Sequence, residues 1–182
     1  HNPDYVDLTA NAAFDPALAR DLLAQAGYAE GFSTTLKLPP PSYARRGGEI
    51  IAAQLREVGI EAEISFLEWA QWLEQVFRGY DYGLTIVSHT EPMDINIYAR
   101  PDYYFQYDNP DFQALIETLA VESDPAARSA LLAQAQTTIA EDFVNGYLFQ
   151  LALTSVVDAK LQGIWKDAPT QAVDLTGVRW AD

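Results

Sequence analysis

The feature that most constrains the fold is a strand–helix–strand pattern in the first third of the chain. Apolar residues alternate over 32–38, and three prolines at 39–41 end that strand. An amphipathic helix is predicted from about residue 44 to 58, where Gly59 stops it, and a second alternating strand covers 60–67. Two strands joined by a helix are expected to lie parallel with a right-handed crossover, so the pattern predicts an α/β fold.

Cap residues and apolar spacing predict further elements. Asp15-Pro16, Asp108-Asn109-Pro110 and Asp124-Pro125 each combine an N-cap side chain with proline in the first helical turn. An aromatic-faced helix is expected to end at Gly79. The apolar and β-branched segment 146–157 is predicted to form one long strand or two short ones. Because no repeat or obvious linker is present, we expect residues 1–182 to form a single domain.

Composition excludes several classes of function. The formal net charge is −15, and the basic residues cluster only at Arg45-Arg46, so we expect no nucleic-acid partner. The chain has no cysteine, which removes disulfides, thiolate catalysis and zinc–thiolate sites. It contains no phosphate-binding loop or dinucleotide fingerprint, and no apolar run near the roughly 20 residues of a membrane span. We therefore expect neither a cofactor nor a membrane-spanning segment.

The stretch VSHTEPMDINIY, residues 87–98, carries the main candidate site. It directly follows a third predicted strand, 82–87, and brings His89, Glu91 and Asp94 together within six positions. Open α/β sheets tend to hold ligands outside the carboxyl ends of their strands. We therefore interpret this loop as one wall of a binding cleft.

Two chemical alternatives remain open at this loop. His89, Glu91 and Asp94 offer the mixed nitrogen and oxygen ligands of a zinc, manganese or nickel site, although their spacing matches no helical pair. A hydrolase would instead use two carboxylates, one protonated and one ionised. The candidates for that pair are Asp81, Glu91, Asp94 and Asp102. Nucleophilic catalysis is disfavoured, because the chain contains no G-x-S-x-G elbow.

Aromatic residues crowd the region just after the loop. They are Tyr98, Tyr103, Tyr104, Phe105 and Tyr107. Such rings near a cleft stack on sugars or cover a peptide, since they combine a large apolar area with a polar group. The alternative for any single ring, which the sequence leaves equally open, is that it fills the edge of the core. The pattern as a whole favours a binding protein over an enzyme.

Four segments also occur in the order known from a protein family. They are FDPALARDLLAQAGYAEGF (14–32), AAQLREVGIEAEISFLEWAQWL (52–73), YDYGLTIVSHTEPMD (80–94) and YDNPDFQALIETLAVESDPAARSALLAQAQTTIAED (107–142). Together they resemble the family 5 extracellular solute-binding proteins, which are the receptors of ABC importers for peptides, nickel, opines and some oligosaccharides. The resemblance implies a non-enzymatic receptor for a peptide or another small polar solute.

The resemblance also implies an architecture and partners. The family's proteins are two-lobed clamps, so residues 1–182 would form the C-terminal ligand-binding lobe of a periplasmic-binding-protein-like fold, with a mixed sheet flanked by helices. The N-terminal lobe would lie outside the chain. The partners would be a small-molecule or peptide ligand and an ABC permease in the inner membrane. The location would be the periplasm, or the cell exterior with a membrane anchor in a Gram-positive host. The expected ligand contacts are His89, Thr90, Glu91, Asp94, Tyr98, Tyr103 and Tyr104.

Overall fold

The structure, a computed structural model, describes residues 2–89, 94–152, 154–166 and 174–181. The chain divides into two compact units. We call residues 8–89 and 100–108 the sheet unit, and the described residues among 1–7, 90–99 and 109–182 the helical unit. None of the helices in the described ranges has the length and hydropathy of a membrane span.

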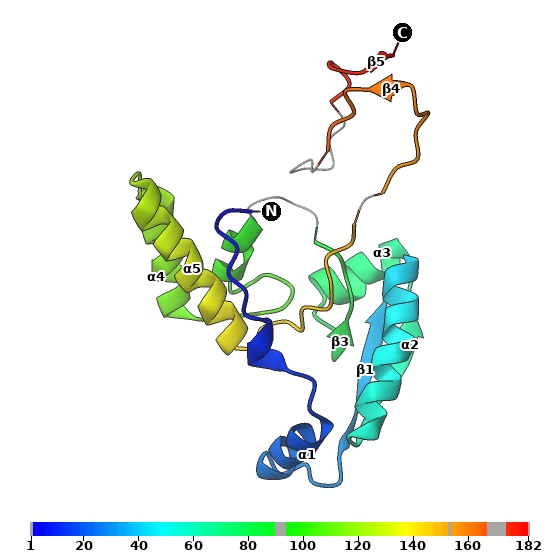
Figure 1. The fold of residues 1–182 in the computed structure, drawn as a ribbon. Helices are drawn as coiled ribbons and strands as arrows, with labels where there is room; N and C mark the ends of the chain where they lie inside the picture. The colour runs from blue at the N-terminus through cyan, green and yellow to red at the C-terminus, as the bar shows by residue number, and fades with distance from the viewer. Residues whose placement is uncertain (1, 90–93, 153, 167–173, 182) are drawn as a thin grey trace. The chain divides into compact units, whose positions relative to one another are not determined.

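The sheet unit contains the predicted strand–helix–strand arrangement. β1 (Phe32–Leu38) pairs in parallel along its whole length with β2 (Ile60–Phe66), and α2 (Ser42–Glu57) connects them. β3 (Leu84–Thr85) pairs in parallel with the other edge of β1, so the strand order is β2-β1-β3. Figure 1 shows α2 running alongside these strands. The predicted α/β class is confirmed, and the carboxyl ends of the three strands meet at one edge of the sheet.

Successive side chains of β1 point to opposite faces of the sheet, so the apolar Leu36 and Leu38 lie on one face and the charged Lys37 lies on the other. Leu36 and Leu38 are buried in a cluster with alanines of α2 and β2. Lys37, which lies between them, is only 9% exposed. Its Nζ atom donates to Asp81 Oδ2 at 2.8 Å and to Gln75 Oε1 at 3.0 Å. Lys37 is therefore a buried cation whose charge is satisfied by these two side chains.

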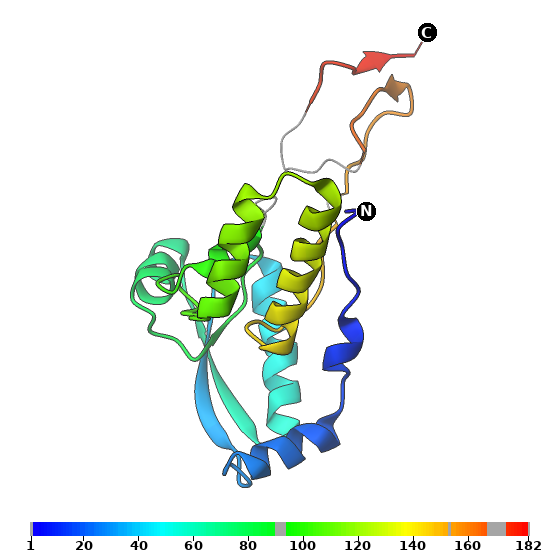
Figure 2. The same ribbon diagram turned by 90° about the vertical axis from the view of Figure 1, so that its left-hand side faces the viewer.

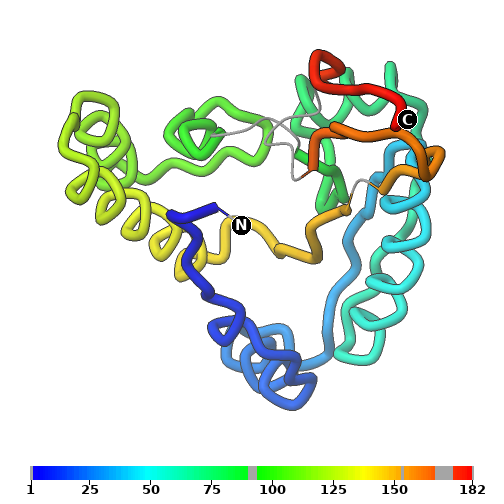
Figure 3. The backbone as a smooth tube through the Cα atoms, turned by 45° about the horizontal axis from the view of Figure 1, so that its top comes forward, coloured from blue at the N-terminus to red at the C-terminus, as the bar shows by residue number. Residues whose placement is uncertain are grey.

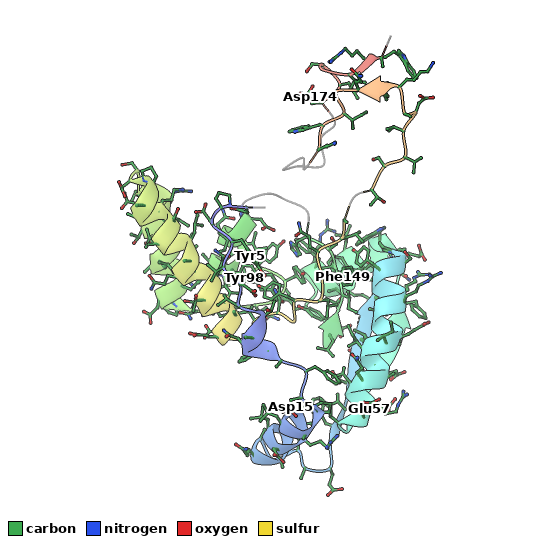
Figure 4. All side chains as sticks on the ribbon, viewed as in Figure 1. Tyr5, Asp15, Glu57, Tyr98, Phe149 and Asp174 are labelled. Atoms are coloured by element: carbon green, nitrogen blue, oxygen red, sulfur yellow. The ribbon has the colours of Figure 1, made fainter. Side chains whose placement is uncertain are left out.

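The other helices of the sheet unit follow their local signals. α1 (Pro16–Gln25) begins after Asp15, whose carboxylate accepts hydrogen bonds from two backbone N–H groups of the first turn (Figure 4). α3 (Trp69–Trp72) continues without a break as a π-helical segment, η2 (Leu73–Arg78). That segment ends at Gly79, as predicted, but its π-helical form was not predicted.

The helical unit contains two long helices that lie side by side. They are α4 (Pro110–Val121) and α5 (Pro125–Glu141), and Figure 2 shows them as neighbours. Each begins with the predicted proline after a capping side chain, which is Asn109 for α4 and Asp124 for α5. A short 3₁₀ helix, η3 (Asp94–Ala99), packs against α4.

The prediction of strand structure at 146–157 is wrong for the described residues of that segment. Residues 146–152 and 154–157 adopt no strand, and their side chains are exposed. Their composition favours a strand, but a strand also needs a partner for its backbone hydrogen bonds, and no described strand pairs with them. Instead, the two-residue strands β4 (Leu161–Gln162) and β5 (Arg179–Trp180) pair antiparallel (Figure 3).

Candidate functional site

The candidate loop begins at the carboxyl edge of the sheet. The backbone N–H of Ser88 donates to the hydroxyl oxygen of Tyr43, in the first turn of α2, at 2.9 Å. His89 comes next and is exposed. The loop therefore leaves the sheet at the edge where open α/β folds tend to hold ligands. Thr90 and Glu91, which were predicted to contact a ligand, lie outside the described residues.

His89 is held by Tyr104, which lies 15 positions further along the chain. The Nε2 atom of His89 and the hydroxyl oxygen of Tyr104 are 3.0 Å apart, which is a hydrogen-bond distance. The two rings are almost parallel, with 4° between their planes and 6.0 Å between their centroids. Tyr103 places its ring centroid 6.3 Å from that of His89. The structure thus brings three of the predicted contact residues together in the sheet unit.

Tyr104 belongs to the core more than to the surface. It is 6% exposed and packs against Trp72 in the second hydrophobic cluster of the sheet unit. Its backbone carbonyl accepts a hydrogen bond from the hydroxyl of Tyr82 at 2.8 Å. Burial raises the pKa of Tyr82, which favours the protonated phenol that donates this hydrogen bond. Tyr104 supports the exposed imidazole of His89, whereas Tyr103 is only partly buried.

Two aromatic residues that sequence reasoning did not assign to the site complete this cluster. The ring of Trp72 meets the ring of Tyr104 nearly edge-on, with centroids 5.7 Å apart. Phe77 lies 5.5 Å from Tyr104 and 5.7 Å from Tyr103, in each case between ring centroids. Phe77 lies in the π-helical segment, where hydrogen bonds run from i to i+5. A 3.6-residue apolar period does not reveal such a segment, although the aromatic residues at 69, 72 and 77 are a visible signal.

Asp94 and Tyr98 lie in the helical unit, on η3. The hydroxyl oxygen of Tyr98, labelled in Figure 4, lies 3.0 Å from that of Tyr147 and accepts a hydrogen bond from Asn145 Nδ2 at 2.8 Å. Desolvation of its hydroxyl end, together with the hydrogen bond to Tyr98, raises the pKa of Tyr147, although the residue as a whole is 66% exposed. The Tyr98 ring meets Phe112 of α4 edge-on, with centroids 6.5 Å apart. Both units therefore carry polar aromatic groups with fixed positions.

The groups around His89 can form hydrogen bonds and aromatic contacts with a ligand. Within the described ranges, no three His, Cys, Asp or Glu side chains come together as a set of metal ligands. Of the carboxylates considered for a hydrolase, Asp81 is engaged by Lys37 at 2.8 Å. The imidazole of His89 forms hydrogen bonds as donor or acceptor, and the neighbouring phenol ring of Tyr103 offers a flat apolar face with a polar end. These groups are suited to a polar solute that also has an apolar part.

Comparison with known proteins gives one family match. Residues 1–106 match a family described as bacterial extracellular solute-binding proteins, family 5, middle. A dipeptide-binding protein of Pseudomonas aeruginosa is 36% identical over 80 residues, which cover 41% of this chain and 15% of that protein.

Two solved structures are similar to this chain in fold. The periplasmic binding protein DppA of Helicobacter pylori, which is associated with an ABC transporter and was solved with the peptide STSA, is 25% identical. Its TM-score is 0.61 over 69% of this chain and 27% of that one. A dipeptide-binding protein of a Pseudoalteromonas species, solved with Met-Leu, is 23% identical, with a TM-score of 0.68 over 92% of this chain and 36% of that one. The likeness confirms a periplasmic-binding-protein-like fold, and this chain spans only a minor part of each of these longer proteins.

Proposed function

The chain belongs to family 5 of the bacterial extracellular solute-binding proteins, and we propose that it captures a peptide, or a similar small polar solute, for an ABC importer. The family and the relatives described above are binding proteins rather than enzymes. The names of these relatives specify dipeptides and one short peptide. Delivery of the solute to a permease in the inner membrane, and a location in the periplasm or anchored at the cell exterior, belong to the same proposal.

The observation that carries the proposed site is the exposed His89, which Tyr104 holds at the carboxyl edge of a parallel sheet. His89 supplies a hydrogen bond or a charge to a polar group of the ligand, and Tyr103 covers an apolar part of it. Tyr104 acts by holding His89. The further contacts in this proposal are Thr90, Glu91, Asp94 and Tyr98.

The proposed ligand is enclosed only when a second lobe closes over this one. The matched relatives are much longer than this chain, and we propose that residues 1–182 contribute to one lobe of a clamp. Closure stabilises the complex because both lobes contact the ligand only in the closed state. This chain by itself supplies only part of the contacts and part of the burial, so its affinity for a dipeptide is expected to be weak.

The test is an NMR titration of the amide signals of this chain with the dipeptide Met-Leu, with an oligosaccharide pool and with Zn²⁺. We expect Met-Leu to shift signals within residues 88–107, and the shifts to weaken in His89→Ala. Tyr28→Phe is a control at a distant position in the chain, because Tyr28 is 51% exposed and lies outside residues 88–107.

The same titration separates the alternatives. A response to Zn²⁺ alone that disappears in His89→Ala would indicate a metal site. Cleavage of Met-Leu during the titration would indicate a hydrolase. A Met-Leu response that lies wholly outside residues 88–107 would contradict the proposed site.

A further inference from the structure

Trp72 is fixed to the sheet by two consecutive hydrogen bonds. Its indole Nε1–H donates to Thr85 Oγ1 at 2.9 Å. The hydroxyl of Thr85 donates in turn to the backbone carbonyl of Lys37 at 2.7 Å. Thr85 lies in β3 and Lys37 in β1, and Trp72 itself is only 4% exposed. The indole therefore cannot change its orientation without breaking a partly buried hydrogen bond.

Trp72 in turn restricts the ring of Tyr104. The two ring planes make an angle of 68°, with centroids 5.7 Å apart, which is a favourable edge-to-face arrangement. The backbone of Tyr104 is fixed separately, because its carbonyl accepts a hydrogen bond from the hydroxyl of Tyr82 at 2.8 Å. Tyr104 is thus held both at its ring and at its main chain.

The hydroxyl of Tyr104 is the end of this series of contacts, and it reaches His89. The distance from this oxygen to His89 Nε2 is 3.0 Å, and the parallel rings restrict how the imidazole tilts. His89 is exposed and follows the last strand of the sheet, so its orientation is not determined by burial of its own ring. Tyr104, with its hydrogen bond and parallel ring, and Tyr103, with its neighbouring ring, both contribute to that orientation.

We propose that Trp72 is a positioning residue that sets the orientation of the His89 imidazole through Tyr104. Its effect on ligand affinity rests on the proposed function, whereas its effect on His89 does not. A fixed imidazole binds a ligand group without first losing rotational freedom. If the imidazole is no longer held, it must be ordered on binding, and we expect Met-Leu binding to weaken by about 2- to 10-fold, the cost of ordering one side chain.

The contact between His89 Nε2 and the Tyr104 hydroxyl is followed by ¹⁵N NMR of the imidazole nitrogens, because their chemical shifts respond to hydrogen bonding. The chain has two histidines, His1 and His89, so the spectrum of His89→Gln identifies the His89 signals by difference. Tyr104→Phe removes only the hydroxyl and is expected to shift the Nε2 signal. Trp72→Phe leaves Tyr104 intact and is expected to shift the same signal in the same direction by a smaller amount.

Two matched substitutions serve as controls. Tyr28→Phe and Trp180→Phe make the same chemical changes at exposed positions and are expected to leave the His89 signals unchanged. If Trp72→Phe also leaves them unchanged while Tyr104→Phe shifts them, the proposal is overturned. If Trp72→Phe disturbs the fold, Thr85→Val and Thr85→Ser decide instead. Thr85→Val removes the hydroxyl that fixes the indole and should shift the His89 signals, whereas Thr85→Ser keeps that hydroxyl and should not. Equal signals in these two variants would also overturn the proposal.

Met-Leu binding is recorded separately on the same variants. If the parent chain binds Met-Leu and Trp72→Phe weakens it by the expected factor, both proposals are supported. If Met-Leu leaves the loop signals unchanged in the parent, the proposed ligand site fails, while the shift of the His89 nitrogen signals still supports the positioning role of Trp72.

Discussion

Gly47 and Gly48 are neighbours in α2 that should respond differently to the same substitution. A Cβ atom added at Gly47 would meet nothing within 4 Å. One added at Gly48 would lie 3.0 Å from Leu38 Cδ2 and 3.2 Å from Leu38 Cγ, with Cδ1 closer still. Leu38 is fully buried in the cluster between β1 and α2, so it has little room to move away.

The magnitude follows from two opposing effects. Replacing glycine by alanine inside a helix stabilises it by about 1 kcal/mol, and this gain is common to both variants. Overpacking of a dense core costs about 1–3 kcal/mol, and only Gly48→Ala suffers it. Gly47→Ala should therefore be more stable than the parent by about 1 kcal/mol, and more stable than Gly48→Ala by about 1–3 kcal/mol.

The assay is urea unfolding followed through amide NMR signals of the sheet unit, with midpoints compared at an unchanged slope. Leu38→Ala normally costs about 2–5 kcal/mol, but it should cost less in the Gly48→Ala background because the clash is removed. Equal stabilisation by the two single alanine substitutions would refute this reasoning, since it would mean that Leu38 does not pack against Gly48.

Three further substitutions test other parts of the structure. Asn109→Ala removes the N-cap of α4 and should destabilise the helical unit by about 1 kcal/mol, measured as a lower urea midpoint of its amide signals. Asp81→Ala leaves the buried Lys37 with only its neutral partner; because the Asp81 side chain is 77% exposed, we expect a loss of roughly 1–2 kcal/mol, less than for a fully buried pair, and a thermal midpoint equal to the parent's would contradict it. The pKa of Tyr147 is higher in the folded than in the unfolded chain, so its contribution to stability is present below the ordinary pKa of 10.0 and is lost as the pH rises further. Tyr147→Phe should therefore lose less stability than the parent above that pH, as measured by thermal midpoints, whereas parallel curves would show that Tyr147 is not responsible.

The elements that sequence reasoning predicted correctly depend on residues that are close together in the chain. Asp15, Asn109 and Asp124 cap helices because each side chain reaches backbone N–H groups only two or three positions ahead. The third strand was predicted over 82–87, yet only Leu84–Thr85 pairs with β1, because pairing depends on register with a strand far away in the sequence. For the described residues of 146–157 the predicted strand failed for the same reason, since composition favours a strand but does not provide its partner.

The sequence by itself determined the α/β class, the strand–helix–strand unit, the capped helices and the position of the loop after β3, because these depend on local periodicity, caps and turns. It also identified His89 and the tyrosines at 103 and 104 as candidates. Only the tertiary structure decided that Tyr104 is buried against Trp72 while its hydroxyl meets His89. A local pattern does not specify which distant ring fills a given space in the core. That choice is made by close packing, which couples every side chain to neighbours from several elements at once.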